Sequence, residues 1–332
     1  MSLRARILSR LRRLKPAWTL YNVAHWRQLR RNAAHYKRLG IERTVLGPVS
    51  HRDIQRSGGE QPWLDRPDAA EGLAKAETSG LPEQVVAKLP GWIDDGFLVL
   101  DGFFDSARVD RINAELERLL DDGAIDYHYR GNRIVDAFKR SDEVRGALTE
   151  PTLMRLLEFL LGRPVSLFQS INFFEGSGQR AHSDSFHMTT EPIGYLVAIW
   201  VALEDVAPDS GPVFYYPGSH RLPYLMSEDL GGEGDSRLFL AEGKQERYEE
   251  RIAEELAESG IERVDFLAGK GDVLIWHANL LHGGSPIERP GATRRSLVAH
   301  YFANGVLCYH EVTERPALLS GSPEGGSSAA RP

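Results

Sequence analysis

The chain has 332 residues, 42% of them hydrophobic and 26% charged, which is typical of a globular protein with a sizeable core. No stretch approaches the roughly 18 consecutive apolar residues of a membrane span, and the first residues lack the apolar core of a secretory signal. A single cysteine, Cys308, excludes an internal disulfide. We therefore expect a cytoplasmic protein in which histidine and carboxylate groups would hold any metal.

The net charge of −7 divides unevenly along the chain. Residues 1–45 contain 12 Lys+Arg and one acid, a net of +11, whereas the remainder has a net of −18. Apolar residues at helical spacing, opposite a face rich in arginine, predict an amphipathic helix that ends before Pro16: Leu3, Ile7, Leu8, Leu11 and Leu14. This basic helical arm, residues 1–47, is expected to pack on the acidic body of its own or a second copy, or to lie peripherally on an anionic membrane. No recognition module supports nucleic-acid binding.

The middle of the chain changes from turns to helices. Residues 48–85 are polar and rich in turn residues, which predicts a linker-like segment. The short apolar run FLVL at residues 97–100 then predicts a strand, and SARVDRINAELERLL after it has apolar residues at helical spacing. Residues 151–161, with proline in the first turn, form another short helix.

Strands dominate beyond residue 164. Each candidate is rich in β-branched and aromatic residues and is closed by Gly, Pro or Asp: VSLFQSINFFEG, GYLVAIWVALED, GPVFYYPG, GDVLIWHANLLHGG and RRSLVAHYFAN. Helices that precede a run of strands predict an antiparallel α+β domain, mainly β, such as a jelly roll. Residues 226–263 interrupt the run and are expected to form a mobile lid. The low-complexity tail, residues 313–332, should be disordered.

Three residues form a candidate metal site. His182 and Asp184 are two positions apart, so in an extended chain both side chains leave the same face. That spacing is weak by itself, because it occurs again at His51 and Asp53 in the turn-rich segment, where nothing supports a function. His282 follows an apolar strand and precedes a Gly-Gly turn, where a sheet folding back could bring it beside His182. Two imidazoles and one carboxylate are typical of non-haem iron(II) oxygenases, whereas zinc favours a closed tetrahedral site.

Arg294 is a candidate for binding a cosubstrate. It begins the strand RRSLVAHYF, and its planar guanidinium suits a bidentate grip on the far carboxylate of a dicarboxylate. Ser296 shares its face of the strand and could add a hydroxyl. From the spacing alone, the simpler reading is that Arg294 and Arg295 are both surface charges.

The order of these motifs resembles the phytanoyl-CoA dioxygenase family. The motifs that carry the resemblance lie between about residues 90 and 305: GFLVLDGFFDSARVDRINAEL, HSDSFH, WVALEDV, SGPVFYYPGSH, GDVLIWHANLLHGGS and TRRSLVAHYF. The resemblance implies a cupin-like double-stranded β-helix over residues 86–312. It implies iron(II) bound by His182, Asp184 and His282, 2-oxoglutarate bound at its distal carboxylate by Arg294, and Trp200 beside that cosubstrate.

One departure from the family concerns a hydroxyl. Members often carry one two residues after the distal histidine, whereas this chain has Gly284 there and Ser285 one position later. Among other polar residues, Gln169 and Asn172 are candidates for contact with the cosubstrate. His187 could line the substrate pocket or be structural.

The expected activity follows from the resemblance. We expect an iron(II) enzyme that uses 2-oxoglutarate and O2 to hydroxylate an unactivated C–H bond of a small-molecule or lipid-like substrate, releasing succinate and CO2. A halogenase would need a small residue in place of Asp184. Desaturation or epimerisation at the same site stays open, as does a catalytically idle β-helix that acts as a binding scaffold.

Overall fold

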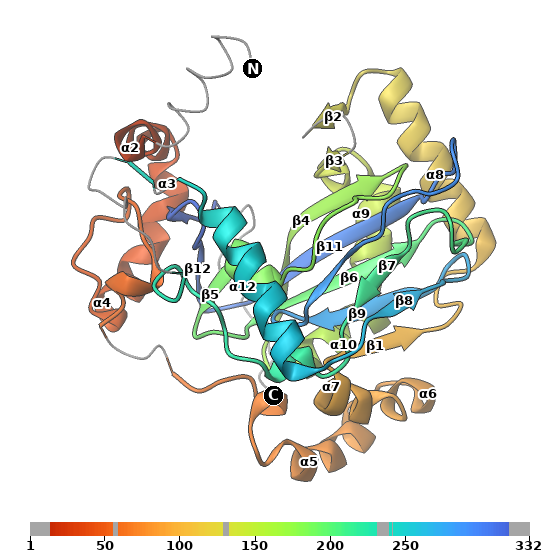
Figure 1. The fold of residues 1–332 in the computed structure, drawn as a ribbon, viewed down its shortest axis with the longest axis horizontal. Coiled ribbons are helices and arrows are strands. Elements are labelled where there is room, and N and C mark those ends of the chain that lie inside the picture. Colours follow the sequence, from red (N-terminus) through yellow and green to blue (C-terminus); the bar gives the residue numbers. More distant parts are fainter. Residues whose placement is uncertain (1–13, 56–58, 129–132, 231–238, 241, 319–332) are drawn as a thin grey trace, which may run out of the picture.

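The computed structural model describes residues 14–55, 59–128, 133–230, 239–240 and 242–318. Its centre is an antiparallel seven-stranded sheet in the order β1-β9-β6-β11-β4-β3-β2 (Figure 1). These strands are β1 (Phe97–Leu100), β9 (Val273–His277), β6 (Leu196–Ala202), β11 (Ser296–Ala303), β4 (Val165–Phe173), β3 (Arg133–Val135) and β2 (Tyr127–His128). A second antiparallel sheet has the order β10 (His282–Gly284), β7 (Val213–Tyr215), β8 (Val264–Phe266), and a third has β13 (Arg315–Pro316), β12 (Leu307–His310), β5 (Thr189–Glu191). All six stretches predicted as strands, FLVL at residues 97–100 and the five beyond residue 164, are confirmed as strands.

The large sheet separates two apolar clusters because side chains alternate along each strand. In β6, Ile199 and Val201 face one cluster, whereas Trp200 and Ala202 face the other. The first cluster lies under a layer of helices: α7 (Leu89–Asp95), α8 (Ser106–Asp121), α9 (Asp142–Leu148) and α10 (Pro151–Leu161). The second cluster lies between the large sheet and the β10-β7-β8 sheet, where the Trp200 and Phe266 rings are 5.8 Å apart. Two facing sheets with helices on one outer side give the α+β architecture that was predicted.

The described part of the basic arm packs on the body of the chain. It forms α2 (Lys15–Ala24), α3 (Trp26–Leu29) and α4 (Ala33–Leu39), beside β12 and β5 (Figure 1). Tyr36 and Leu39 are buried against Leu307 and Tyr309 of β12. The amphipathic stripe predicted for residues 3–14 lies outside the described residues, except for Leu14. Within those described residues, no helix combines the length and the apolar character that crossing a membrane requires.

The segment predicted as a linker is instead largely packed. It contains the short helices η2 (His51–Asp53), η3 (Trp63–Asp65), α5 (Ala69–Gly72), η4 (Leu73–Thr78) and α6 (Glu83–Val86). The Trp63 indole N–H donates to the carbonyl of Phe159 at 2.9 Å, and Leu64 and Val85 are buried. The local composition is polar, but these few apolar residues contact the helical layer. A linker was therefore the wrong expectation here.

Two segments remain, the one predicted to be a lid and the C-terminal tail. Residues 226–263 contain α12 (Lys244–Ser259), whose Tyr248 and Ile252 are buried with Phe186 and Leu281. Their mobility stays a prediction. At the C-terminal end, β13 pairs with β12, so disorder was wrong for residues 315–316; residues 319–332 lie outside the described part.

Candidate active site

Chain segments far apart in the sequence meet at the metal-site candidates. His182 and His282 form an antiparallel bridge in which the backbone N–H of each donates to the carbonyl of the other, at 2.9 Å. Asp184 is the first residue of the short helix α11 (Asp184–His187), so the extended conformation expected for the motif ends at Ser183. One ligand atom from each of the three lies within 4.8 Å of the others, and all three residues are buried. The structure thus brings together the predicted triad.

The two imidazoles are held in the tautomer that a metal needs. Nδ1 of His182 lies 2.9 Å from the carbonyl of Arg180, and Nδ1 of His282 lies 2.9 Å from the carbonyl of Leu280. A carbonyl only accepts, so each Nδ1 carries a proton, which leaves each Nε2 as the ring atom that can bind a metal. Burial, together with the neighbouring His282, lowers the pKa of His182 and keeps it neutral.

Asp184 is held as an oriented carboxylate. The Trp276 indole N–H donates to its Oδ2 at 2.8 Å, and Nε2 of His300 lies 3.5 Å from the same oxygen. The other oxygen, Oδ1, lies 3.8 Å from Nε2 of His282. Burial alone would raise the pKa of Asp184, but His282 and His300 outweigh it and the pKa is lowered. The site therefore offers one carboxylate oxygen and two imidazole nitrogens, a set of ligands that a divalent metal can bind.

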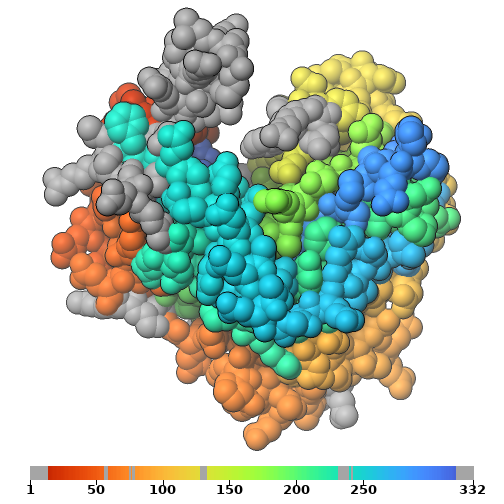
Figure 2. All heavy atoms as spheres, viewed as in Figure 1, coloured from red at the N-terminus to blue at the C-terminus, as the bar shows by residue number. Residues whose placement is uncertain are grey.

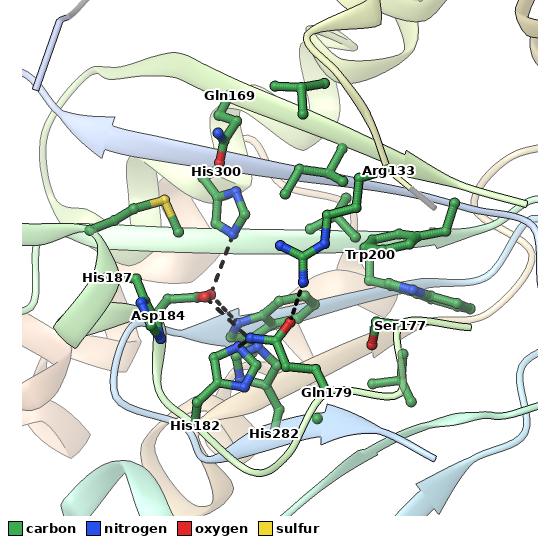
Figure 3. A pocket seen from close by; sticks show the side chains of 18 of the residues that line it. Arg133, Gln169, Ser177, Gln179, His182, Asp184, His187, Trp200, His282 and His300 are labelled. Carbon is green, nitrogen blue, oxygen red and sulfur yellow. Dashed lines mark hydrogen bonds and ion pairs between the residues drawn. The ribbon is translucent and has the colours of Figure 1, made fainter. Parts of the chain in front are cut away.

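A polar chain crosses the mouth of this triad. Arg133 donates from Nη2 to Oε1 of Gln179 at 2.9 Å, and Nε2 of Gln179 lies 3.0 Å from Nε2 of His182 (Figure 3). Arginine only donates, so the orientation of the Gln179 amide is fixed with its NH2 group toward the triad.

The triad lies in a cavity of about 310 Å³ between the two facing sheets. Arg294 lines it and is only 1% exposed. Its guanidinium carbon is 5.6 Å from the ring centres of both Phe173 and Trp200, and Nη1 donates to Ser296 at 3.0 Å. Burial lowers the pKa of Arg294 to about 10, so it stays cationic at neutral pH. Its Nε has no hydrogen-bond partner in the described part of the chain.

Arg295, the next residue, points the other way. It forms an ion pair with Glu117 and lies over the Phe174 ring, outside the cavity. The strand therefore places Arg294 inside and Arg295 outside, and the reading of both as surface charges was wrong for Arg294.

The other residues predicted from the sequence divide between the two faces of the large sheet. Trp200 and Gln169 line the cavity. Ser296 is fully buried behind Arg294. Asn172 is a correction: its neighbours Ile171 and Phe173 line the cavity, so Asn172 points to the opposite face, and contact with a cosubstrate there was the wrong expectation.

The hydroxyl that family members often have at the position of Gly284 is replaced in space by the hydroxyl of Ser177. A side chain at Gly284 would collide with Oγ of Ser177, which lines the cavity. Ser285, which follows Gly284 in the chain, instead accepts a hydrogen bond from Arg263 at 2.6 Å. The loop before the triad thus brings a hydroxyl to the position where the glycine leaves space.

Among the remaining histidines, His187 lines the cavity, whereas His277 bonds Asp65 at 3.0 Å and His220 lies 3.2 Å from the carbonyl of Ile93. Sequence reasoning missed His300. The two-residue spacing of one strand face, extended from Arg294 through Ser296, would have found it. Trp276 and Gln179 gave no comparable signal.

Known proteins share this arrangement of motifs. A protein-family model described as phytanoyl-CoA dioxygenase (PhyH) matches residues 92–296. The chain is 23% identical over 243 residues to the peroxisomal phytanoyl-CoA dioxygenase of Bos taurus, covering 66% of this chain and 68% of that protein. It is 28% identical over 241 residues to an ectoine dioxygenase of Sphingopyxis alaskensis (strain DSM 13593 / LMG 18877 / RB2256), covering 67% of this chain and 74% of that protein.

A solved structure agrees with the fold. The epimerase SnoN, in complex with Fe3+, alpha ketoglutarate and nogalamycin RO, is 25% identical with a TM-score of 0.52. The similarity covers 75% of this chain and 94% of that chain. The region matched by the family model contains His182, Asp184, His282 and Arg294.

Proposed function

The chain belongs to the phytanoyl-CoA dioxygenase family of iron- and 2-oxoglutarate-dependent oxygenases, and on that premise we propose that it hydroxylates an unactivated C–H bond of a small molecule. Its catalytic domain is a double-stranded β-helix over residues 86–312, with the two facing sheets as its walls. One observation carries the proposal: two imidazoles and one carboxylate, all buried, place a ligand atom each within 4.8 Å of the others, a set that suits iron(II).

The chain's own residues have distinct roles in this proposal. His182, Asp184 and His282 hold the iron, and Trp276 turns the Asp184 carboxylate so that Oδ1 faces the two Nε2 atoms. Arg294 binds the distal carboxylate of 2-oxoglutarate. Support comes from its burial with no ion pair to an acidic side chain of the described residues, because a buried cation is costly until an anion joins it.

Aromatic side chains complete the cosubstrate end of the cavity. Trp200 and Phe173 flank the Arg294 guanidinium and exclude water from the ion pair that it would form. Ser296 fixes one guanidinium nitrogen, and Ser177 provides a hydroxyl nearby. Iron and 2-oxoglutarate, with O2, supply the oxidant that removes hydrogen from the substrate, and 2-oxoglutarate leaves as succinate and CO2.

A second outcome is favoured by one comparison. SnoN, which is described as an epimerase, shares the fold and 25% of the sequence, so the same site chemistry serves a reaction without net hydroxylation. Hydroxylation adds one oxygen atom from O2 to the product, whereas epimerisation and desaturation add none.

Turnover under ¹⁸O2 tests the proposal. The proposal expects consumption of 2-oxoglutarate, equimolar succinate and a product that is heavier by one ¹⁸O atom. A product without the label would replace hydroxylation by epimerisation or desaturation. Absence of any 2-oxoglutarate consumption with iron present would favour an idle binding scaffold.

A further inference from the structure

A second cavity of about 300 Å³ adjoins the one that holds the triad. Gln169 and His310 line both cavities, so these two side chains form the boundary that the cavities share. The second cavity is walled by α2, by η5 (Ala137–Lys139), by β4 and by the β12–β13 hairpin. In Figure 2 the surface is hollowed between α12, in cyan, and the edge strands in yellow and green.

Much of this second cavity comes from outside the region that the family model matches. Tyr21 and Asn22 belong to the basic arm, and His310 and residues 315–318 follow the last matched residue, 296. Segments at both ends of the chain therefore shape a cavity that the matched region alone would leave open. A wall built from such additions is suited to recognising one particular substrate.

The triad cavity has two ends. Arg294, two residues before β11, and His300 within β11 both face the cavity and lie six residues apart, which is about 20 Å along an extended chain. Gln169 pairs with His300 and lies beside it (Figure 3). It is therefore at the end of the cavity away from Arg294. The Arg294 end is taken by 2-oxoglutarate in the proposed function. The end with Gln169, His187 and His310 is therefore left for the substrate.

Two polar side chains that line both cavities, the Gln169 amide and the His310 imidazole, are uncharged. Burial lowers the pKa of His310 to about 3, so its imidazole is neutral at physiological pH. Nε2 of His187 and Nδ1 of His300 are buried and have no hydrogen-bond partner within the described chain. Buried groups of this kind call for a ligand that can bond them.

The charged groups of the second cavity already have partners. Lys139 forms an ion pair with Asp136 at 2.7 Å. Arg315 donates to Thr313 at 3.3 Å and lies 4.0 Å above the Trp18 ring. The phosphates of an acyl-CoA would require cations that are free, and a hydrocarbon chain would leave the imidazoles and the Gln169 amide unbonded.

We propose that the two adjoining cavities together form the substrate site and that they take an uncharged molecule bearing hydroxyl or carbonyl groups. The reacting carbon lies by the triad, Gln169, His187 and His310 bond the polar groups next to it, and the part beyond them lies against α2. This assignment rests on the proposed function. It makes Gln169 a contact of the substrate, whereas the sequence alone made it a candidate contact of the cosubstrate.

Substrate-stimulated turnover of 2-oxoglutarate tests the assignment. The full chain, loaded with iron(II), is incubated with three small-molecule fractions of a cell extract: neutral water-soluble compounds, CoA thioesters and lipids. We expect the neutral fraction to stimulate succinate formation above the basal rate. Stimulation by the thioester or lipid fraction instead, or by no fraction while basal turnover persists, would overturn the assignment. Absence of basal turnover would count against the proposed function itself.

Two variants connect the stimulation to these cavities. Gln169→Leu and His310→Leu each remove one polar contact, and we expect each to reduce stimulation by the neutral fraction about tenfold. Thermal melting checks that both variants are folded, and Gln169→Glu restores a hydrogen-bonding group if the leucine variant is not. Gln84→Leu, on the exposed surface of α6, is the matched control and should behave as the wild type. Equal stimulation of wild type and both cavity variants would also overturn the assignment.

Discussion

Replacing Arg294 by methionine should separate binding of 2-oxoglutarate from stability of the fold. The buried guanidinium has one hydrogen bond to Ser296 and two flanking aromatic rings, and its Nε is unpaired. Two charge-assisted hydrogen bonds to a carboxylate would contribute about 2–4 kcal/mol. The variant should therefore raise the KM for 2-oxoglutarate roughly 30- to 700-fold.

The same substitution should not destabilise the protein when no cosubstrate is bound. Methionine removes a buried cation that forms no ion pair within the described part of the chain, so the melting temperature of the unliganded variant should stay the same or rise. The stabilisation that 2-oxoglutarate gives the iron-loaded wild type should be lost. The assay is thermal melting under anaerobic conditions, with and without 2-oxoglutarate, beside steady-state kinetics. Arg295→Met, outside the cavity, is the control. An unchanged KM in Arg294→Met would refute the assigned role, and a large loss of stability would indicate a structural cation.

The remaining predictions concern the metal, α12 and pH. Asp184→Ala should abolish iron-dependent succinate formation, whereas Asp53→Ala, in the other His-x-Asp motif, should keep it; activity in the first variant would contradict the ligand set. The Tyr248 hydroxyl lies 2.8 Å from the backbone nitrogen and 2.9 Å from the Oγ of Ser183, the residue between the ligands His182 and Asp184. Tyr248→Phe removes these hydrogen bonds, so we expect an iron titration to show weaker binding while the melting temperature changes little. If α12 is only a mobile lid, iron affinity should not change. The pKa of His310 is lowered to about 3 in the folded protein, so between about pH 6.5 and 3 the unfolded chain binds a proton at this residue and the folded protein does not. The free energy of unfolding should therefore fall as the pH drops through that range. In denaturant titrations at several pH values, His310→Gln should reduce the dependence of the free energy of unfolding on pH. An unchanged dependence would show that other groups cause the loss of stability in acid.

The sequence was sufficient for the strands and for the triad. Successive side chains of a strand point to opposite faces of the sheet, so a continuous apolar run such as LVAIWVA predicts a strand that is buried on both faces. His282 could be placed beside His182 because a sheet that folds back brings distant segments together. Arg294 could be placed on the inner face only through the family resemblance, since spacing alone did not distinguish it from Arg295.

What the sequence did not reveal depends on tertiary contacts. Trp63 lies in a polar stretch, and its burial is decided by α10, which begins almost ninety residues later. Gln179 and Ser177 are loop residues whose direction is set by Arg133 and by the space at Gly284. Asn172 was assigned to the wrong face because side chains alternate along β4, and a residue three positions after the cavity-lining Gln169 points away from the cavity.

One spectroscopic titration tests the central claim most directly. Iron(II) chelated by 2-oxoglutarate gives a charge-transfer absorption band in the visible range, so the band reports metal and cosubstrate in one site. We predict that the anaerobic wild-type protein develops this band with one equivalent of iron, that His282→Ala does not, and that Arg294→Met requires far more 2-oxoglutarate. A band that forms equally in all three proteins would contradict the assignment of this cavity as the iron and 2-oxoglutarate site.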